Sequence, residues 1–88
     1  PAATLVIAYV NRGNAHDTLG NTDLAIADHT KAIELSPDFA IAYYSRGLVY
    51  RNRGENDKAI ADFQKTVELS AGDNLGDLAQ EQITELGG

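Results

Sequence analysis

The residues of this chain that are best suited to chemistry are its two histidines, His16 and His29. Imidazole binds transition metals and changes its charge near neutral pH, so the pair could supply two metal ligands or act as a pH switch. No cysteine occurs in the sequence, and no carboxylate is spaced to complete a metal shell. The simpler interpretation, which we favour, is that both imidazoles are neutral and partly buried, and fill spaces of aromatic size.

The chain carries none of the motifs that mark common catalytic or cofactor sites. It has no phosphate-binding glycine loop, no nucleophile elbow, no HExxH sequence and no calcium-loop spacing. The absence of cysteine excludes disulfides, thiolate zinc sites and cysteine catalysis. The carboxylates are scattered over what should be solvated helix surfaces, so we predict that the protein is not an enzyme and needs no cofactor.

The composition is that of one small globular domain, assigned here to residues 1–88. Hydrophobic residues make up 43% and charged residues 23%, with 13 acidic and 7 basic side chains and a net charge of −6. A negative chain is unsuited to nucleic acid and to anionic membrane surfaces, so neither is an expected partner. The apolar run at residues 2–10 covers about half of the roughly 20 residues that a membrane-spanning helix needs.

Two expectations concern the origin of the chain. No charged leader with a cleavage site precedes the apolar run, so no signal peptide is expected, and the lack of cysteine favours a reducing, cytoplasmic compartment over secretion. A sequence that starts at Pro1 without a methionine suggests a piece of a longer protein.

An internal repeat of 34 residues must position all of these side chains. Aligning residues 6–39 with residues 40–73 gives 15 identical pairs out of 34, far more than chance produces. The identical pairs include Arg12-Gly13 with Arg46-Gly47, and Ala25-Ile26-Ala27-Asp28 with Ala59-Ile60-Ala61-Asp62. The domain therefore consists of repeat 1, at about residues 6–39, and repeat 2, at about residues 40–73.

Each repeat is predicted to be a pair of helices joined by a tight turn. Apolar and small residues recur at spacings of three and four over Leu5–Leu19, Asp23–Leu35, Phe39–Arg53 and Asp57–Leu69. Gly20 and Gly54 end the first helix of each pair, because glycine takes the left-handed conformation without steric strain. Side-chain oxygens of Asn21–Asp23 and Asn56–Asp57 are expected to cap the second helix.

A fifth helix is predicted at about Asp73–Leu86 and does not complete a third repeat. Its apolar residues fall on one arc, made of Leu75, Leu78, Ala79, Ile83 and Leu86. Its acidic residues form a stripe, made of Asp73, Asp77, Glu81 and Glu85. Like charges at this spacing repel one another, so the stripe must face water. A helix of this kind is suited to cap a stacked array, and we assign residues 74–86 to a capping helix.

The 34-residue helix–turn–helix period resembles the tetratricopeptide repeat. The pattern of that family is matched by Tyr9, Gly13, Ala25 and Pro37 in repeat 1 and by Tyr43, Gly47, Tyr50, Ala59 and Phe63 in repeat 2. The Asn-Arg-Gly and Ala-Ile-Ala-Asp segments are similar to an Arg-Gly variety common in bacterial repeat proteins. The resemblance implies an all-α, right-handed α-solenoid of about five helices that binds other proteins and does not catalyse a reaction.

The resemblance also implies where a partner would bind. In this family the first helix of each repeat lines a concave groove, which receives a peptide or a partner helix. The corresponding positions are Ile7, Val10, Asn11, Asn14, Asp17 and Thr18 in repeat 1, Ile41, Tyr44, Ser45, Leu48, Arg51 and Asn52 in repeat 2, and Leu75, Leu78 and Gln82 in the capping helix. An alternative for Val10 and Leu48 is that they only support packing.

One subclass of the family is excluded on its residue pattern. Tetratricopeptide domains that grip the C-terminal carboxylates of heat-shock chaperones use two lysines, an arginine and two asparagines. Asn14 matches one asparagine, whereas Val10, Ser45, Leu75 and Ala79 stand where the other four residues belong. Without cations the desolvation of a bound carboxylate is not compensated, so we expect no binding of this kind.

A second functional hypothesis is structural self-association within a larger repeat protein. About three repeats are normally needed to bury a continuous core, and this chain has two and a capping helix. An exposed N-terminal edge at Ala2, Leu5 and Ala8, or the groove itself, would then form homo-oligomers.

Arg12 and Arg46 replace a usual leucine of the family, and Asp28 and Asp62 recur with them at the 34-residue offset. An arginine near a packed surface usually has a partner, and the recurring aspartate is the obvious one. The sequence leaves open whether each pair forms within a repeat, whether Asp28 pairs with Arg46 across the stack, or whether the arginines extend into solvent.

His16 and His29 occupy the places of Tyr50 and Phe63 in repeat 2, both of which are aromatic. Burial disfavours the charged imidazole, so we expect both histidine pKa values to fall below the unfolded value of about 6.5. Nearby acids on this anionic chain would act in the opposite direction.

Overall fold

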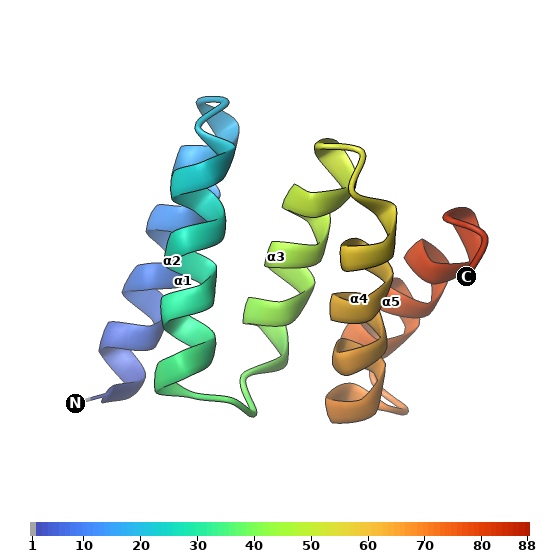
Figure 1. Cartoon of the computed structure of the whole chain (residues 1–88). Helices are drawn as coiled ribbons and strands as arrows, with labels where there is room; N and C mark the ends of the chain where they lie inside the picture. Colours follow the sequence, from blue (N-terminus) through green and yellow to red (C-terminus); the bar gives the residue numbers. More distant parts are fainter. Residues whose placement is uncertain (1) are drawn as a thin grey trace.

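Five α-helices follow one another in the computed structural model, which describes residues 2–88. They are α1 (Ala2–Thr18), α2 (Thr22–Leu35), α3 (Ala40–Asn52), α4 (Asn56–Ser70) and α5 (Asn74–Glu85). Figure 1 shows them side by side in chain order, with the two ends of the chain at opposite ends of the row. The predicted all-α solenoid is confirmed. Pro1 and the side chain of Ala2, which was expected at an N-terminal edge, lie outside the described residues.

The helices pack as successive neighbours: α1 on α2, α2 on α3, α3 on α4 and α4 on α5. Gly20 and Gly54 have φ values of 81° and 79°, which ends α1 and α3 in the left-handed turn that the sequence predicts. Each turn returns the chain antiparallel to its first helix. The chain is therefore two helical hairpins followed by the single helix α5. Among the helices described, none has both the length and the apolarity to cross a membrane.

One glycine in each hairpin lets the two helices of that hairpin approach closely. A Cβ atom added to Gly13 would lie 2.7 Å from Cε1 of His29, and one added to Gly47 would lie 2.7 Å from Cε1 of Phe63. Both rings are fully buried, so each hairpin is centred on one ring that packs against a glycine of the facing helix. The repeat thus places His29 where repeat 2 has Phe63, as the sequence predicts.

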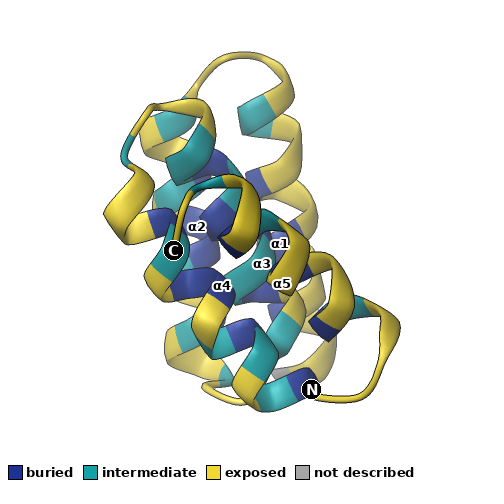
Figure 2. Cartoon of the chain, turned by 90° about the vertical axis from the view of Figure 1, so that its right-hand side faces the viewer, coloured by how far each residue is buried: buried dark blue, intermediate teal, exposed yellow. Residues whose placement is uncertain are grey.

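The buried side chains form two clusters between the helices. One contains Val6, Val10, Ala32 and Ala42 and joins the first hairpin to α3. The other contains Ala59, Phe63, Ala79 and Ile83 and joins the second hairpin to α5. Figure 2 shows the buried positions on the facing sides of the helices and the exposed positions on their outer sides. Because each cluster is shared with the next element, α5 covers apolar surface that the second hairpin would otherwise expose.

The predicted side-chain caps of α2 and α4 are wrong. No side-chain hydrogen bond caps α2 at Asn21, and α4 begins after Glu55, which also makes no cap bond. Asp23 instead accepts a hydrogen bond from Arg53 of repeat 2, and Glu55 accepts another from the same guanidinium at 2.6 Å. The contact between Arg53 and Asp23 therefore ties the turns of the two hairpins together. A side-chain cap is present at α5, where Asp73 accepts the N–H of Gly76 at 3.1 Å.

On α5, the acidic stripe of Asp77, Glu81 and Glu85 is exposed, as predicted. The predicted apolar arc is partly wrong, because Leu78 is 46% exposed while Ala79 and Ile83 are buried. With no helix packed on its outer side among the described residues, α5 buries only the narrow strip that touches α4.

Candidate functional site

The predicted groove positions begin at two exposed isoleucines, Ile7 in α1 and Ile41 in α3. They are 50% and 46% exposed, respectively, although isoleucine is among the residues most often buried. They occupy equivalent positions, each being the second residue of its 34-residue repeat. Each lies beside a hollow in the surface.

The first hollow has a volume of about 220 Å³ and is mainly apolar. It is lined by Ala3, Val6 and Ile7 of α1 and by Leu35, Ser36 and Phe39 at the end of α2 and in the following loop. It exists because α2 ends at Leu35, so the chain turns towards α3 and leaves the first two turns of α1 uncovered on that side.

The second hollow is wider, at about 480 Å³, and lies between the starts of α3 and α5. It is lined by Phe39, Ala40, Ile41, Ser70, Asp73, Asn74 and Leu75. Four residues of the first hollow correspond to four residues of the second at an offset of 34: Val6 to Ala40, Ile7 to Ile41, Ser36 to Ser70 and Phe39 to Asp73. The two hollows are therefore copies of one feature, and Phe39 belongs to both.

The two hollows differ in chemistry even though they share a plan. Asp73 and Asn74 bring a carboxylate and an amide to the second, whereas Ser36 is the one polar residue lining the first. A ligand that spans both would meet an apolar surface first and a polar, acidic one next. Phe39 lies between them as the element that both hollows share.

The remaining predicted groove residues do not all reach the surface. Val10 is 3% exposed within the first core cluster, and Ser45 is 8% exposed, so the expectation that they face a ligand is corrected. Both lie on the side of their helix that turns into the core. Asn11, Asn14, Thr18 and Asn52 are exposed, and Asp17 is partly exposed.

Tyr44 and Leu48 are only half exposed and pack against the second core cluster. The ring centroid of Tyr44 lies 5.6 Å from that of Phe63. Because these two residues support the hairpin, removing them would reduce its stability as well as alter the surface. They lie at the predicted positions, but as partly structural residues.

The structure joins two predicted groove residues from different helices. Nη1 of Arg51 in α3 donates a hydrogen bond to Oε1 of Gln82 in α5. This contact crosses from repeat 2 to the capping helix and engages Arg51, the one cation among the predicted groove positions. The groove therefore offers little free positive charge.

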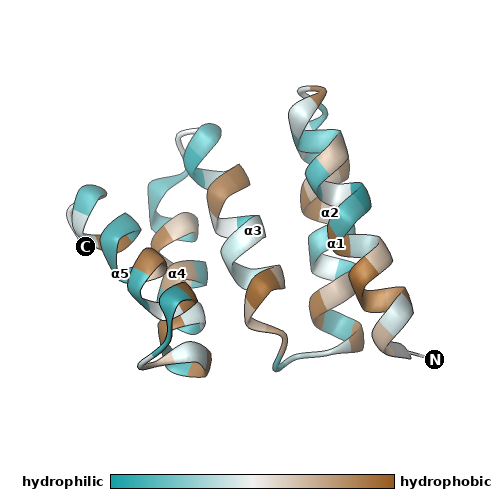
Figure 3. Cartoon of the chain, turned by 180° about the vertical axis from the view of Figure 1, so that it is seen from behind, coloured by the Kyte–Doolittle hydropathy of each residue, from teal (hydrophilic) through white to brown (hydrophobic). Residues whose placement is uncertain are grey.

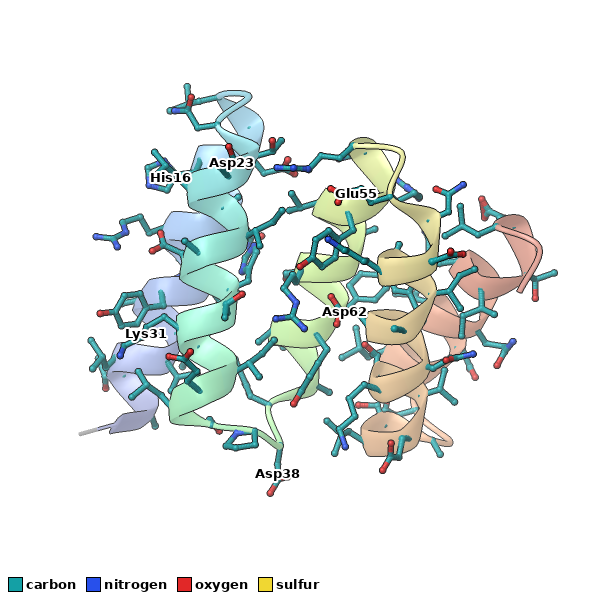
Figure 4. The ribbon with its side chains drawn as sticks, in the orientation of Figure 1. His16, Asp23, Lys31, Asp38, Glu55 and Asp62 are labelled. Atoms are coloured by element: carbon teal, nitrogen blue, oxygen red, sulfur yellow. The ribbon has the colours of Figure 1, made fainter. Side chains whose placement is uncertain are left out.

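The recurring arginines pair with aspartates within each repeat. Nε and Nη2 of Arg12 donate to the two carboxylate oxygens of Asp28 at 2.7 Å each, and Arg46 binds Asp62 in the same way at 2.8 Å. In Figure 4 Asp62 points from α4 towards α3. The Arg12 guanidinium holds the pKa of Asp28 below its usual value, mainly through these hydrogen bonds.

Arg46 has one contact that Arg12 lacks. Its Nη1 donates to Oγ1 of Thr30 in α2, at 3.2 Å, so Arg46 also links the two repeats. The sequence alternatives are thereby resolved: the ion pairs lie within each repeat, and the link across the stack is to a threonine and not to Asp28.

The two histidines differ from each other in burial. Burial lowers the pKa of His29 to about 4, against the opposing effect of Asp28 and Asp17, and Arg46 lowers it further. Neither ring nitrogen of His29 has a hydrogen-bond partner within the described residues. This part of the pKa prediction is confirmed.

His16 is not a buried equivalent of His29. Its side chain is 26% exposed, and its Nε2 lies 3.7 Å from Oδ2 of Asp28. Figure 4 shows it at the outer side of the first hairpin, away from α3. His16 is thus partly buried, as the sequence predicts. Within residues 2–88 no group of three or more His, Cys, Asp or Glu side chains is gathered as a metal ion would require.

Sequence reasoning missed the loop residues of the site. It took groove positions from the first helix of each repeat and so left out Leu35, Ser36 and Phe39, and Ser70, Asp73 and Asn74. The available signal was the repeat itself, because the same residue type stands at Ser36, directly after α2, and at Ser70, the last residue of α4. What the repeat could not show is that the ends of these helices leave a hollow.

The family model described as tetratricopeptide repeat matches residues 10–74. This chain belongs to the tetratricopeptide repeat family. The match covers most of α1, all of α2, α3 and α4, and the start of α5. No curated protein matches the sequence of this tetratricopeptide repeat domain.

Two solved structures show the same fold. One is described as the first TPR of Spaghetti (RPAP3) bound to the HSP90 peptide SRMEEVD; it has a TM-score of 0.83 and 21% identity, over 93% of this chain and 63% of that one. The other is described as the crystal structure of MamA; it has a TM-score of 0.73 and 30% identity, over 92% of this chain and 56% of that one. This tetratricopeptide repeat domain thus spans less than two thirds of the length of both.

Proposed function

We propose that this tetratricopeptide repeat domain binds a segment of another protein along the face formed by α1, α3 and α5, without catalysing a reaction. The observation that carries the proposal is the pair of repeat-related hollows, each beside an exposed isoleucine, with Phe39 shared between them. Exposed isoleucines in concave surface are typical of sites that receive apolar side chains.

The chemistry of the face restricts the partner. A segment that places an apolar residue in the first hollow and a polar or basic residue near Asp73 in the second would match both. The spacing of the hollows by one repeat suits an extended peptide or one face of a helix, which present side chains at regular intervals. One structural neighbour is described as binding a peptide, which supports a peptide-binding role for this fold.

The proposal can be tested by selecting peptides that bind the domain from a randomised library. The affinity of the selected peptides is then measured for variants of the domain. We expect Ile7→Asn and Ile41→Asn together to weaken the selected peptides by at least about tenfold, since each isoleucine contributes apolar contact area. Both side chains are exposed, so the helical content and the unfolding temperature should stay near those of the unsubstituted domain.

Leu19→Asn and Leu24→Asn provide the matched control. Leu19 and Leu24 are 75% and 53% exposed but do not line either hollow, so these changes should leave peptide affinity unchanged. Peptides that bind the isoleucine variant as tightly as the unsubstituted domain would show that the hollows are not the binding site. Tyr44 and Leu48 are poorer positions for this test, because both pack on the core.

A further inference from the structure

The outward side of α1 carries a small surface made of Leu5, Ala8, Tyr9 and Arg12, which we call the α1 end face. These four residues line an open hollow of about 190 Å³. Leu5 is 47% exposed and Ala8 is exposed too, although both are apolar. Figure 3 shows hydrophobic residues along the N-terminal half of α1, at the end of the row of helices. Leu5 and Ala8 are exposed while Val6 and Val10 are buried in the core, and Tyr9 lies between the two sides, because it also packs against that core.

The repeat places the same four positions on α3, where they are covered. At an offset of 34 they are Phe39, Ala42, Tyr43 and Arg46. Ala42 is fully buried in one cluster with Ala32 of α2, and Phe39 packs against that cluster. The side chain of Arg46 is 20% exposed, against 63% for Arg12. The α1 end face is therefore an uncovered copy of the surface on which α3 receives α2.

Two hydrogen bonds hold α2 on that surface of α3. Nη1 of Arg46 donates to Oγ1 of Thr30 at 3.2 Å, and the hydroxyl of Tyr43 donates to the carbonyl oxygen of Pro37 at 2.9 Å. The first acceptor lies in the second half of α2, and the second lies in the turn by which the chain leaves that helix.

The α1 end face has the same two donors without acceptors. Arg12 uses Nε and Nη2 for Asp28, but within residues 2–88 its Nη1 donates no hydrogen bond. The hydroxyl of Tyr9 donates none there either, and the ring of Tyr9 lies 5.5 Å from the guanidinium of Arg12. Both donors are thus held in place by contacts within the first hairpin.

We propose that the α1 end face binds a partner helix with the chemistry of the second half of α2. That helix presents a hydroxyl side chain, as Thr30 does, and a small residue two positions later, as Ala32 does. Five positions further, in the turn after the helix, it presents a backbone carbonyl oxygen, as Pro37 does. The hydroxyl accepts from Arg12, the small residue packs near Ala8, and the carbonyl accepts from Tyr9. This interaction is separate from the proposed peptide-binding face.

The contact of α4 with α5 shows that not every helix of this fold has that chemistry. Gln64 of α4 and Ala71, directly after α4, stand at the positions of Thr30 and Pro37. In α5, Asp77 and Gln80 stand at the positions of Tyr43 and Arg46. The α4–α5 contact therefore lacks the threonine and tyrosine hydrogen bonds. This makes α4 a matched helix that the α1 end face should not recognise.

A second, natively folded copy of the chain is not the occupant. Its Thr30 side chain and Pro37 carbonyl already accept hydrogen bonds from its own Arg46 and Tyr43, and its Ala32 is buried against Ala42. The surface of α2 that would dock is therefore covered in every folded copy. The helix must come from a segment that is not already packed in this way.

A peptide of residues 22–38 of this chain, with both ends blocked, serves as the probe, and residues 56–72 serve as the α4 control. Titrated into isotope-labelled domain, the α2 peptide should shift the backbone amide NMR signals of Leu5–Arg12 and leave those of Ile41 and Leu75 in place. The α4 peptide should bind at least about tenfold more weakly, since Gln64 replaces the hydroxyl of Thr30 and the larger Thr66 replaces the small Ala32. Tyr9→Phe should weaken the α2 peptide by about threefold to tenfold, and Ala8→Glu by more than tenfold, while Leu24→Glu should have no effect.

Isolated helices of this length are only marginally helical, so a second format joins the α2 peptide to the domain through a flexible linker. The fusion should raise the unfolding temperature of the domain, and Ala8→Glu should remove the increase. No amide shifts at about 2 mM peptide together with no increase in the fusion would overturn the proposal. Amide shifts centred on Ile41 and Leu75 would also overturn the proposal, and would support the peptide-binding face instead. A dimer of the domain that Ala8→Glu dissociates would overturn it too, and would assign the α1 end face to self-association.

Discussion

Arg46 binds the carboxylate of Asp62 with two hydrogen bonds of 2.8 Å, while the Asp62 side chain is only 7% exposed. A carboxylate so deeply buried depends on its partner, because the interior replaces the water that would otherwise solvate the charge. Arg12 and Asp28 have the same geometry, but the side chain of Arg12 is 63% exposed.

Removing Arg46 should therefore be more harmful than removing Arg12. We expect Arg46→Leu to lower the free energy of unfolding by about 2–4 kcal/mol, because it leaves the Asp62 charge buried without a partner. Adding Asp62→Leu should recover part of that loss, and chemical denaturation of both single variants and the double variant gives the coupling free energy. A coupling under about 0.5 kcal/mol would mean that the pair is held by surrounding packing alone.

Acid should destabilise the first hairpin through His29. Its pKa is lowered to about 4 by burial, so below about pH 6.5 the unfolded chain binds a proton that the folded chain does not. Stability is thus fully present above pH 6.5 and is lost as the pH falls towards 4. Between pH 7.5 and 5.5 we expect a loss of about 1–1.5 kcal/mol, and His29→Phe should remove most of it.

The second repeat provides the matched control for His29. Phe63 occupies the equivalent place against Gly47, so Phe63→His should lower stability at neutral pH and add a similar dependence on acid. Thermal unfolding of the three proteins at pH 7.5 and 5.5 measures both effects. Equal losses on acidification in the unsubstituted domain and in His29→Phe would show that the acid dependence has another origin.

Gly47→Ala should destabilise the second hairpin by about 1–3 kcal/mol, because the new Cβ would lie 2.7 Å from the ring of Phe63. The same change at Gly13 meets the ring of His29 at the same distance and should act similarly on the first hairpin. In a Phe63→Leu background the harm of Gly47→Ala should be smaller, because the ring edge is gone. Additive losses in that double variant would rule out the steric explanation.

The peptide SRMEEVD, which one structural neighbour is described as binding, should not bind this domain. Val10, Ser45 and Ala79 are 3%, 8% and 0% exposed, and none can supply the charge that a terminal carboxylate needs. Isothermal titration at low salt should give no dissociation constant tighter than about 1 mM. Salt-sensitive binding below about 0.1 mM would contradict this and would direct attention to Arg51.

Much of the fold follows from the sequence alone, because it depends on local patterns. The 34-residue repeat, the spacing of apolar residues and the glycines at 20 and 54 are each properties of short segments, and they predict five helices to within a few residues. The recurrence of arginine and aspartate likewise predicts an ion pair. The predicted side-chain caps of α2 and α4 were wrong: no cap bond forms at Asn21 or Glu55, and Asp23 and Glu55 instead accept hydrogen bonds from Arg53.

What only the tertiary structure decided is which atoms meet across helices. The sequence left open whether Arg46 pairs with Asp62 or Asp28, and the packing of α3 between α2 and α4 assigns Asp62 to its Nε and Nη2 and Thr30 to its Nη1. It also could not separate Val10, which is buried, from Ile7, which is exposed, because one helical turn holds both. Which side of a helix is covered depends on the helices that pack against it. The ends of the stack differ from its middle in these neighbours, so the pattern of burial is a property of the assembled helices and of no single segment.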